Sequence, residues 1–219
     1  MNLAELPLNF GTEKLLLTNQ RALYWQRERI LVISDLHLGK AAHFRKNGIA
    51  IPKQVTLNDL LRLERLLRHY PADKLLIVGD LIHAGNNSEI ILLHALMQKF
   101  PSTRFVLIKG NHDRLPHALL QKIGIQELHE SLTIGTLNFS HEPDANSRAY
   151  SICGHIHPGV RLKLADRSSI SLPCFAVTSK TLVLPAFSHF TGLDTKYGTN
   201  DTEYFALTEN TIFAVNVHP

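Results

Sequence analysis

Short apolar runs separated by polar and charged stretches organise the first half of the chain. Four of these runs have the length and the β-branched or aromatic composition of strands: 23–26, 30–34, 74–78 and 104–108. Between them, apolar residues recur at helical spacing over 52–70 and over 89–100, and Pro71 ends the first of these segments. The alternation of strands and helices predicts parallel strands joined by helical crossovers.

The pattern changes after residue 126, where shorter apolar runs are broken by Gly, Asn, Ser and Pro. The expected strands are 126–129, 131–134, 137–140, 150–153, 160–164, 170–172, 174–178, 181–184, 203–207 and 211–215. They predict a mostly antiparallel second sheet packed on the first. Residues 3–17 are ambiguous, and 115–123 has the pattern of a short helix. Because no repeat or linker divides the chain, we expect a single domain over 1–219.

Polar side chains with metal-binding or catalytic capacity follow five of the runs. They are Asp35 and His37, then Asp80, then Asn111, His112 and Asp113, then His141, and finally His155 and His157. Open α/β sheets bind ligands beyond the carboxyl ends of their strands. Gly110 is expected to allow a backbone conformation that a Cβ would obstruct. In the alternative interpretation of this loop, Asn111 and Asp113 bond to nearby backbone and His112 has no role.

The types of these side chains predict a metal site rather than an ordinary polar loop. Imidazole nitrogens with carboxylate and amide oxygens, and no thiolate, suit Mn, Fe, Zn, Co or Ni and argue against a structural zinc site built from cysteines. Seven ligands are too many for one ion but suit two ions that share a carboxylate. Two ions about 3.5–4 Å apart can hold an attacking water and a phosphoryl group, which is the arrangement that phosphoester hydrolysis requires.

Five short motifs occur along the chain in a fixed order: DLH at 35–37, GD at 79–80, GNHD at 110–113, the single His141 and GHIH at 154–157. In their residues and order they resemble the motifs of the calcineurin-like metallophosphoesterases. One departure is Ser140, since glycine often stands before the fourth-motif histidine in that family. The resemblance implies an α/β fold, a four-layer α-β-β-α sandwich of two mixed β-sheets flanked by helices.

The same resemblance implies a role for each motif residue. The first metal would be held by Asp35, His37, Asp80 and His157, and Asp80 would bridge to a second metal held by Asn111, His141 and His155. His112 would act as the acid that protonates the leaving oxygen or stabilises charge on the phosphate. Asp113 is expected to orient His112 through the other ring nitrogen.

A narrower resemblance covers more of the chain. Six segments of the chain are similar to segments of the ligase-associated DNA damage response endonuclease (PdeM) family. They are DLHLGKAAHFRKNGIAIP, GNHDR, HEP, GHIHPGVRL, LPCF and LPAFSHFTG. This resemblance implies a Mn²⁺-dependent phosphodiesterase or single-strand nuclease that acts in DNA repair, with functional association to a DNA ligase and a helicase.

Composition bears on the charge of a partner and on the cellular compartment. The net charge of +4 and the pI near 9.1 are compatible with a polyanionic partner but are too small to establish one. The two cysteines, Cys153 and Cys174, lie in apolar surroundings and favour a reducing compartment. Neither a signal peptide nor a bilayer-spanning run is evident, so we expect a cytoplasmic protein without membrane association.

Four residues near the motifs are weaker candidates for substrate binding: Lys40, Arg45, His83 and Arg114. A cation at such a position is more often an ordinary solvated charge, as we also expect for Arg161. His83 is equally compatible with substrate contact and with a role in its loop. The remaining histidines, His43 among them, have no strand-end position, and we assign them no function.

Three functions are compatible with these motifs. The favoured hypothesis is a dinuclear-metal phosphodiesterase or nuclease acting on nucleic acid, such as single-stranded DNA, or on cyclic nucleotides. A metal-dependent phosphomonoesterase acting on phosphoproteins or small metabolites would use the same metal site. A non-catalytic scaffold that binds proteins is the third hypothesis, since fold does not fix function. The intact ligand set weighs against the scaffold.

Overall fold

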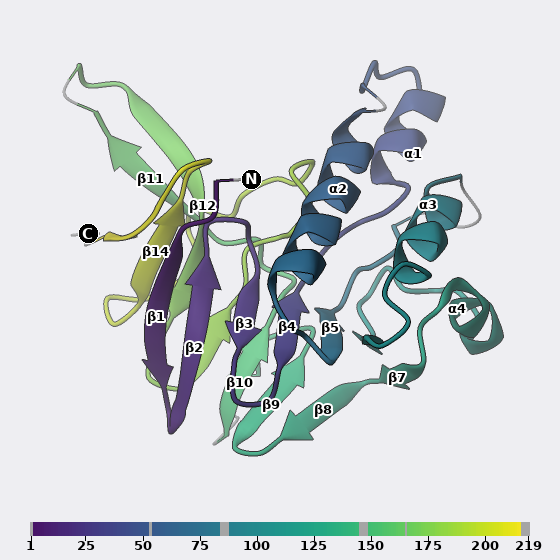
Figure 1. The fold of residues 1–219 in the computed structure, drawn as a ribbon. Coiled ribbons are helices and arrows are strands. Elements are labelled where there is room, and N and C mark those ends of the chain that lie inside the picture. Colours follow the sequence, from purple (N-terminus) through teal and green to yellow (C-terminus); the bar gives the residue numbers. More distant parts are fainter. Residues whose placement is uncertain (1, 53, 84–87, 145–148, 165, 216–219) are drawn as a thin grey trace.

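The computed structural model describes residues 2–52, 54–83, 88–144, 149–164 and 166–215, and in these residues the chain forms two β-sheets and four helices (Figure 1). The strands of the first sheet lie side by side in chain order: β1 (Glu5–Phe10), β2 (Glu13–Thr18), β3 (Leu23–Trp25), β4 (Ile30–Ile33), β5 (Lys74–Val78), β6 (Arg104–Ile108) and β7 (Glu127–His129). Strands β4 to β7 are parallel, as the predicted crossovers require, whereas β1 to β4 are antiparallel.

The helices follow the parallel strands and cover one face of the first sheet (Figure 1). They are α1 (Lys40–Lys46), α2 (Gln54–His69), α3 (Ser88–Met97) and α4 (His117–Ile123). Leu63 of α2 and Leu93 of α3 are fully buried in the same cluster as Ile33 and Ile77 of the sheet. None of the helices in the described residues is long and apolar enough to cross a membrane.

The second sheet is mixed. Its strands are β8 (Ser131–Ile134), β9 (Leu137–Ser140), β10 (Tyr150–Cys153), β12 (Ser169–Val177), β13 (Thr181–Val183), β14 (Glu203–Leu207) and β15 (Ile212–Val215). They lie in the order β15-β14-β12-β13-β10-β9-β8, with β9, β10 and β13 parallel and the other neighbours antiparallel. Strand β11 (Gly159–Lys163) pairs with the first part of β12 to form a hairpin that projects from the body (Figure 1).

The apolar strands of the first sheet are buried on both faces. Val32 of β4 points into the core between the sheets, where it joins Trp25 and Phe139, while the neighbouring Ile33 points toward the helices. This alternation explains why β4, β5 and β6 are continuous apolar runs rather than strands with one polar face.

Three features of the fold differ from the sequence predictions. The ambiguous N-terminal segment is a hairpin of β1 and β2, in which Leu15–Leu17 run consecutively and mask the alternation of a strand. Strand β7, expected in the second sheet, belongs to the first, because α4 returns the chain parallel to β6. The runs on either side of Pro173 form one strand, since β12 changes partners there from β11 to β14.

The predicted α/β fold of two mixed sheets with flanking helices is present, and it differs in one layer. In the described residues every helix lies between residues 40 and 123, on the side of the first sheet. The outer face of the second sheet instead carries Cys153, Ala176 and Val183 beneath Ile156 and Tyr197. Irregular chain therefore takes the place of the second helical layer.

Candidate metal centre

All seven predicted ligands follow strands whose carboxyl ends meet at one end of the two sheets. Asp35 and His37 follow β4, Asp80 follows β5 and Asn111 follows β6, whereas the three other histidines follow β9 and β10 of the second sheet. Backbone bonds join the loops: the N–H of Asp35 donates to the carbonyl of Gly79 (3.1 Å), and that of His37 to the carbonyl of Asp80 (2.9 Å). The parallel order of β4, β5 and β6 places these side chains together.

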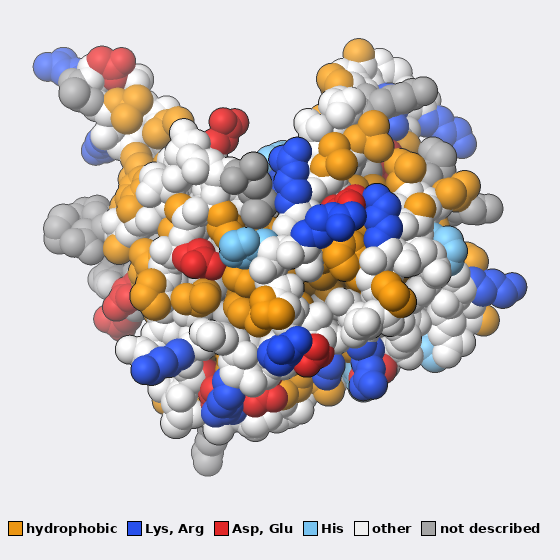
Figure 2. Space-filling view, in the orientation of Figure 1, with side chains coloured by type: hydrophobic (Ala, Val, Ile, Leu, Met, Phe, Trp, Pro, Cys, Tyr) orange, Lys and Arg blue, Asp and Glu red, His pale blue; other side chains and the backbone are white. Residues whose placement is uncertain are grey.

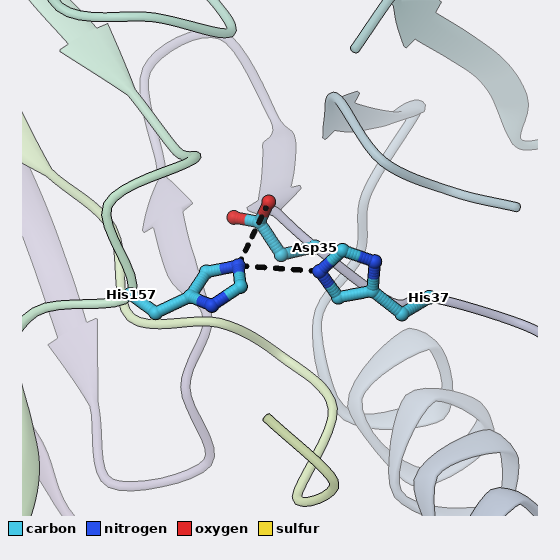
Figure 3. A group of neighbouring side chains, drawn as sticks. All are labelled: Asp35, His37 and His157. Carbon is cyan, nitrogen blue, oxygen red and sulfur yellow. Dashed lines mark hydrogen bonds and ion pairs between the residues drawn. The ribbon is translucent and has the colours of Figure 1, made fainter. Parts of the chain in front are cut away.

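A first group contains Asp35, His37 and His157 (Figure 3). The Nε2 atoms of the two histidines are 3.2 Å apart, and Nε2 of His157 is 3.3 Å from Oδ1 of Asp35. Asp35 is completely buried, and its Oδ1 atom has no hydrogen-bond partner among the described residues. Three atoms with lone pairs thus converge on one point inside the protein.

A second group contains Asp80, His141 and His155. The Nε2 atom of His141 is 3.2 Å from Nδ1 of His155 and 3.5 Å from Oδ1 of Asp80. The two groups are adjacent, because the backbone N–H of His155 donates to Oδ2 of Asp35 in the first group (3.1 Å). The structure thus brings six of the seven predicted ligands together in two neighbouring triads.

The spacing within both triads fits divalent metal ions. Ligand atoms bound about 2.1 Å from one ion stand about 3–3.5 Å from one another, which is the spacing of the three closest contacts described above. Burial lowers the pKa of His37 to about 3, so its imidazole is neutral and keeps a lone pair. The residues present therefore fit one ion per triad.

Five of the predicted ligands have backbones in the left-handed region, which only glycine adopts without strain. Their φ angles are 51° for Asp35, 51° for His37, 48° for Asp80, 66° for His155 and 52° for His157. Only three other non-glycine residues in the described segments share this conformation. Strained backbone of this kind clusters at functional sites, where the surrounding structure holds it in place.

Two glycines make the close packing of the ligands possible. A Cβ atom on Gly79 would lie 1.8 Å from Nδ1 of His141, and one on Gly110 would lie 2.3 Å from Oδ1 of Asp80. Gly110 was expected to allow a conformation that a Cβ would obstruct. The structure shows that the obstruction is the close approach of Asp80, since the φ of Gly110 is not in the left-handed region.

Asn111, the seventh predicted ligand, is exposed and contacts Glu142. Its Nδ2 atom donates to Oε1 of Glu142 over 2.6 Å. Because the amide nitrogen is occupied in this way, Oδ1 is the atom that Asn111 offers to an ion. Glu142 was not singled out as a site residue, although it directly follows His141 in the sequence.

The expected pairing of Asp113 with His112 is wrong. The carboxylate of Asp113 is buried and accepts the backbone N–H groups of Ile82 (3.0 Å) and Gly110 (2.9 Å), and in the described chain no contact joins it to the imidazole of His112. Burial raises the pKa of Asp113 to about 6 against the effect of these two bonds. The alternative interpretation of this loop therefore holds for Asp113.

The carboxylate nearest to His112 is that of Asp80. Its Oδ2 atom is 4.0 Å from Nε2 of His112, and its Oδ1 atom accepts the backbone N–H of the same residue (3.0 Å). The side chain of His112 is 44% exposed, so its ring faces the opening of the site while its backbone is fixed at the metal groups. An acid at the opening is the role that the family resemblance implies for His112, and it stays a prediction.

Two further histidines line the opening. The ring of His83 lies 4.5 Å from that of His112 and 5.6 Å from that of His37, with its Nδ1 buried and without a hydrogen-bond partner in the described chain. His43, to which the sequence gave no role, lies 6.1 Å from His83. Its helical spacing of three residues from Lys40 is the signal that would have found it.

The three candidate cations differ in position. Lys40 is half-buried near the triads: burial lowers its pKa, whereas Asp35 and Asp80 raise it. Arg45 instead pairs with the buried Glu89 (3.4 Å) and bonds to the carbonyl of Ile51, so we withdraw it as a substrate contact.

Arg114 is exposed beside His112, to whose carbonyl its backbone N–H donates (2.9 Å). No acidic side chain pairs with its guanidinium within the part of the chain that is described. Arg161 bonds to Ser169 on the projecting hairpin.

Comparison with known protein families identifies this arrangement. A model of the calcineurin-like phosphoesterase family matches residues 28–165, which include both triads, Asn111 and His112. The chain belongs to this family. It is therefore a metal-dependent phosphoesterase, and its two triads are the candidate sites for the two ions on which calcineurin-like phosphoesterases depend.

Solved structures extend the comparison to nearly the whole chain. The chain is similar to the nuclease MPE of Pseudomonas putida, with 28% identity and a TM-score of 0.79 over 92% of this chain and 96% of that one. It also matches a protein of unknown function, AQ665 of Aquifex aeolicus, with 23% identity and a TM-score of 0.42 over 58% of this chain and 78% of that one. A search of curated proteins gives no match. The calcineurin-like fold is thus shared with a nuclease.

Proposed function

We propose that this calcineurin-like phosphoesterase is a nuclease that hydrolyses phosphodiester bonds in single-stranded nucleic acid. The observation that supports this proposal most is the similarity to the Pseudomonas putida nuclease, which extends over almost the full length of both chains. A fold alone does not fix the substrate, but a fold with both ligand triads and the exposed His112 in place supports the same reaction type.

The roles of the side chains follow from their positions. Two bound divalent ions would supply an activated water and neutralise charge on the phosphoryl group. Asp35, His37 and His157 would hold one ion, and Asp80, His141, His155 and Oδ1 of Asn111 the other; by the family resemblance, Asp80 would be shared with the first ion. His112, at the opening and 4.0 Å from Asp80, would donate the proton that the leaving oxygen requires. Lys40 and Arg114 would hold non-bridging phosphate oxygens.

We propose Mn²⁺ as the ion in both sites. Nitrogen and oxygen ligands without sulfur suit Mn²⁺ and are also compatible with Fe, Zn, Co and Ni, so the donor set supports the choice without deciding it. By resemblance to the ligase-associated endonucleases we further propose a role in DNA repair with a DNA ligase and a helicase. Free, buried Cys153 and Cys174 agree with a cytoplasmic setting.

A substrate panel tests the nuclease proposal. Purified protein loaded with Mn²⁺ is expected to hydrolyse bis(p-nitrophenyl) phosphate faster than the monoester and to cleave single-stranded DNA or RNA. Asp80→Ala removes a ligand from one triad and is the inactive control, with loss of metal measured by calorimetry. A strong preference for the monoester would contradict the nuclease proposal and would assign the protein as a phosphomonoesterase. A preference for cyclic nucleotides would retain the diester chemistry but exclude a polymer.

A further inference from the structure

A groove outside the metal centre is lined by three arginines and one glutamate. It has a volume of about 730 Å³ and lies between α2, the β2–β3 turn and the hairpin of β11 and β12. Arg21, Arg62 and Arg65 line it together with His189, while Ile170 and Leu172 of β12 line it from the hairpin. Figure 2 shows an open notch between this hairpin and the helices α1 and α2, with Lys and Arg side chains beside it.

Arg62 is buried at this groove, and Arg21 is half-buried beside it. The side chain of Arg62 is 8% exposed: it pairs with the buried Asp59 (3.0 Å), donates to the carbonyl of Phe187 and contacts the ring of His189 (2.8 Å), while its Nε atom has no hydrogen-bond partner in the described chain. Arg21 donates to the carbonyls of Ala186 (3.2 Å) and Ser188 (2.8 Å). Neither carbonyl neutralises its charge.

The surroundings of Arg21 disfavour its positive charge. Burial and the neighbouring charge of Arg62, opposed by Asp59, together lower the pKa of Arg21 to about 10. Arg65 adds a third positive charge at the exposed side of the groove. Glu209 is the carboxylate that lines the groove with them. An anion that entered the groove would relieve the repulsion between the arginines.

Shared lining residues relate the groove to the metal centre. The backbone N–H of Ser188 donates to the carbonyl of Asp35 (3.2 Å), which ties the loop that carries His189 to a metal ligand. His189 lines both this groove and a cavity of about 340 Å³ that it shares with Lys40, Phe44 and Phe190. Lys40 in turn lines a third cavity, of about 350 Å³, with His83 at the opening of the site.

Apolar and aromatic surface accompanies the positive charge along this path. Phe44 of α1 and Phe190 are half-buried, and their rings meet edge to face at 5.4 Å. Ile170, 44% exposed, stands on the hairpin side of the groove. A single strand of nucleic acid has the complementary chemistry, because its phosphates are anionic and its unpaired bases present apolar faces to aromatic side chains.

We propose that the groove of Arg21, Arg62, Arg65 and His189 binds the backbone of single-stranded nucleic acid on one side of the phosphate that is cleaved. The strand would run from the metal centre past Phe44 and Phe190 to the arginines. This inference rests on the proposed nuclease function and extends it, since it assigns a binding surface to residues that do not touch the metal centre.

A charge reversal at Arg65 tests the groove, with Arg68 as the matched control. Both side chains are exposed on α2, but Arg68 lies outside the groove and pairs with Glu64. Binding of a fluorescent single-stranded oligonucleotide is measured by anisotropy in chelator over a range of salt. Arg65→Glu is expected to weaken binding about tenfold and to reduce the slope of log K against log salt by about 0.7, the contribution of one phosphate. Arg68→Glu is expected to change neither by more than about twofold.

Cleavage provides an independent measure. With Mn²⁺, the rate on the oligonucleotide is divided by the rate on bis(p-nitrophenyl) phosphate in the same preparation, so that any loss of folded or metal-loaded protein cancels. This ratio is expected to fall for Arg65→Glu and not for Arg68→Glu. Equal ratios for the two variants would contradict the proposed binding groove but would not contradict the proposed nuclease function. A wild-type protein that hydrolyses the small diester but neither binds nor cleaves oligonucleotides would overturn the proposed nuclease itself.

Discussion

The left-handed residues at the strand ends show how this site is built at the level of single residues. A left-handed φ turns the chain sharply as it leaves a strand, so Asp35 and Asp80 present their side chains across the edge of the sheet instead of along it. Each such residue costs about 1–2 kcal/mol relative to a right-handed conformation. The surrounding structure holds these residues in place, and Gly79, itself left-handed, leaves room for the imidazole of His141.

Gly79→Ala is expected to remove metal binding from the triad of Asp80, His141 and His155, because the new Cβ would lie 1.8 Å from Nδ1 of His141. Gly48→Ala is the matched control, since Gly48 has a similar φ (82° against 80°) with no atom within 4 Å of the added carbon. Both variants should lose about 1–2 kcal/mol of unfolding free energy from backbone strain. Only Gly79→Ala should bind fewer ions, as measured by calorimetry. If Gly79→Ala bound two ions per chain and hydrolysed the small diester at the wild-type rate, this explanation of Gly79 would be contradicted.

The helix α1 carries several of the side chains around the opening. It presents Lys40, His43 and Phe44, and it is preceded by its N-cap residue Gly39, whose backbone N–H donates to Oε2 of Glu89 on α3 (2.6 Å). The other carboxylate oxygen of Glu89 pairs with Arg45 (3.4 Å). Glu89 therefore fixes α1 at its N-cap and again near its end.

Replacing Glu89 by alanine is expected to lower the free energy of unfolding by about 1–3 kcal/mol, because the buried N–H of Gly39 would lose its acceptor. Arg45→Ala should cost less, about 0.2–1 kcal/mol, since its pair is longer and partly solvated. Urea unfolding of both variants measures the difference. A larger loss for Arg45→Ala than for Glu89→Ala would show that the ion pair, rather than the bond to Gly39, holds α1.

The elements that were predicted correctly are those whose pattern is local. Strands β4, β5 and β6 were evident because both of their faces are apolar. The candidate ligands were found because each lies within four residues of the end of one of these strands or of a strand of the second sheet. The sequence did not show that β7 belongs to the first sheet, because a strand of three residues with intermediate burial carries too little pattern to identify its partner strand. The role of Asp113 depends on which N–H groups the loop brings near it, and the contact of His43 with His83 depends on how α1 packs.

At the scale of the whole molecule, each triad combines residues that follow strands of both sheets. Asp35 and His37 come from the first sheet and His157 from the second, and Asp80 likewise meets His141 and His155 across the boundary. The core between the sheets, with Trp25, Phe139 and Phe175, holds the two halves in this register. Bound ions would therefore connect the sheets at one end of that core.

Metal is consequently expected to stabilise the entire fold rather than a loop. At a free Mn²⁺ concentration 100 times the dissociation constant, one site adds about 2.7 kcal/mol to the free energy of unfolding. Thermal unfolding with increasing Mn²⁺ should show a rising midpoint, and a chelator should reverse it. The change should be smaller in His157→Ala, which lacks a ligand of the first triad. A midpoint that does not depend on Mn²⁺ would contradict a site shared between the sheets.

The position of the ligands directly at the strand ends has a consequence for how this protein can be modified. The candidate metal ligands lie next to the strand ends, whereas the residues that would meet a substrate lie further along the loops, in 38–52, 112–118 and 187–193. Chemistry and specificity are thus encoded in separate parts of each loop. Grafting the outer part of one loop from a relative would therefore offer a route to a new preference without rebuilding the hydrolytic apparatus.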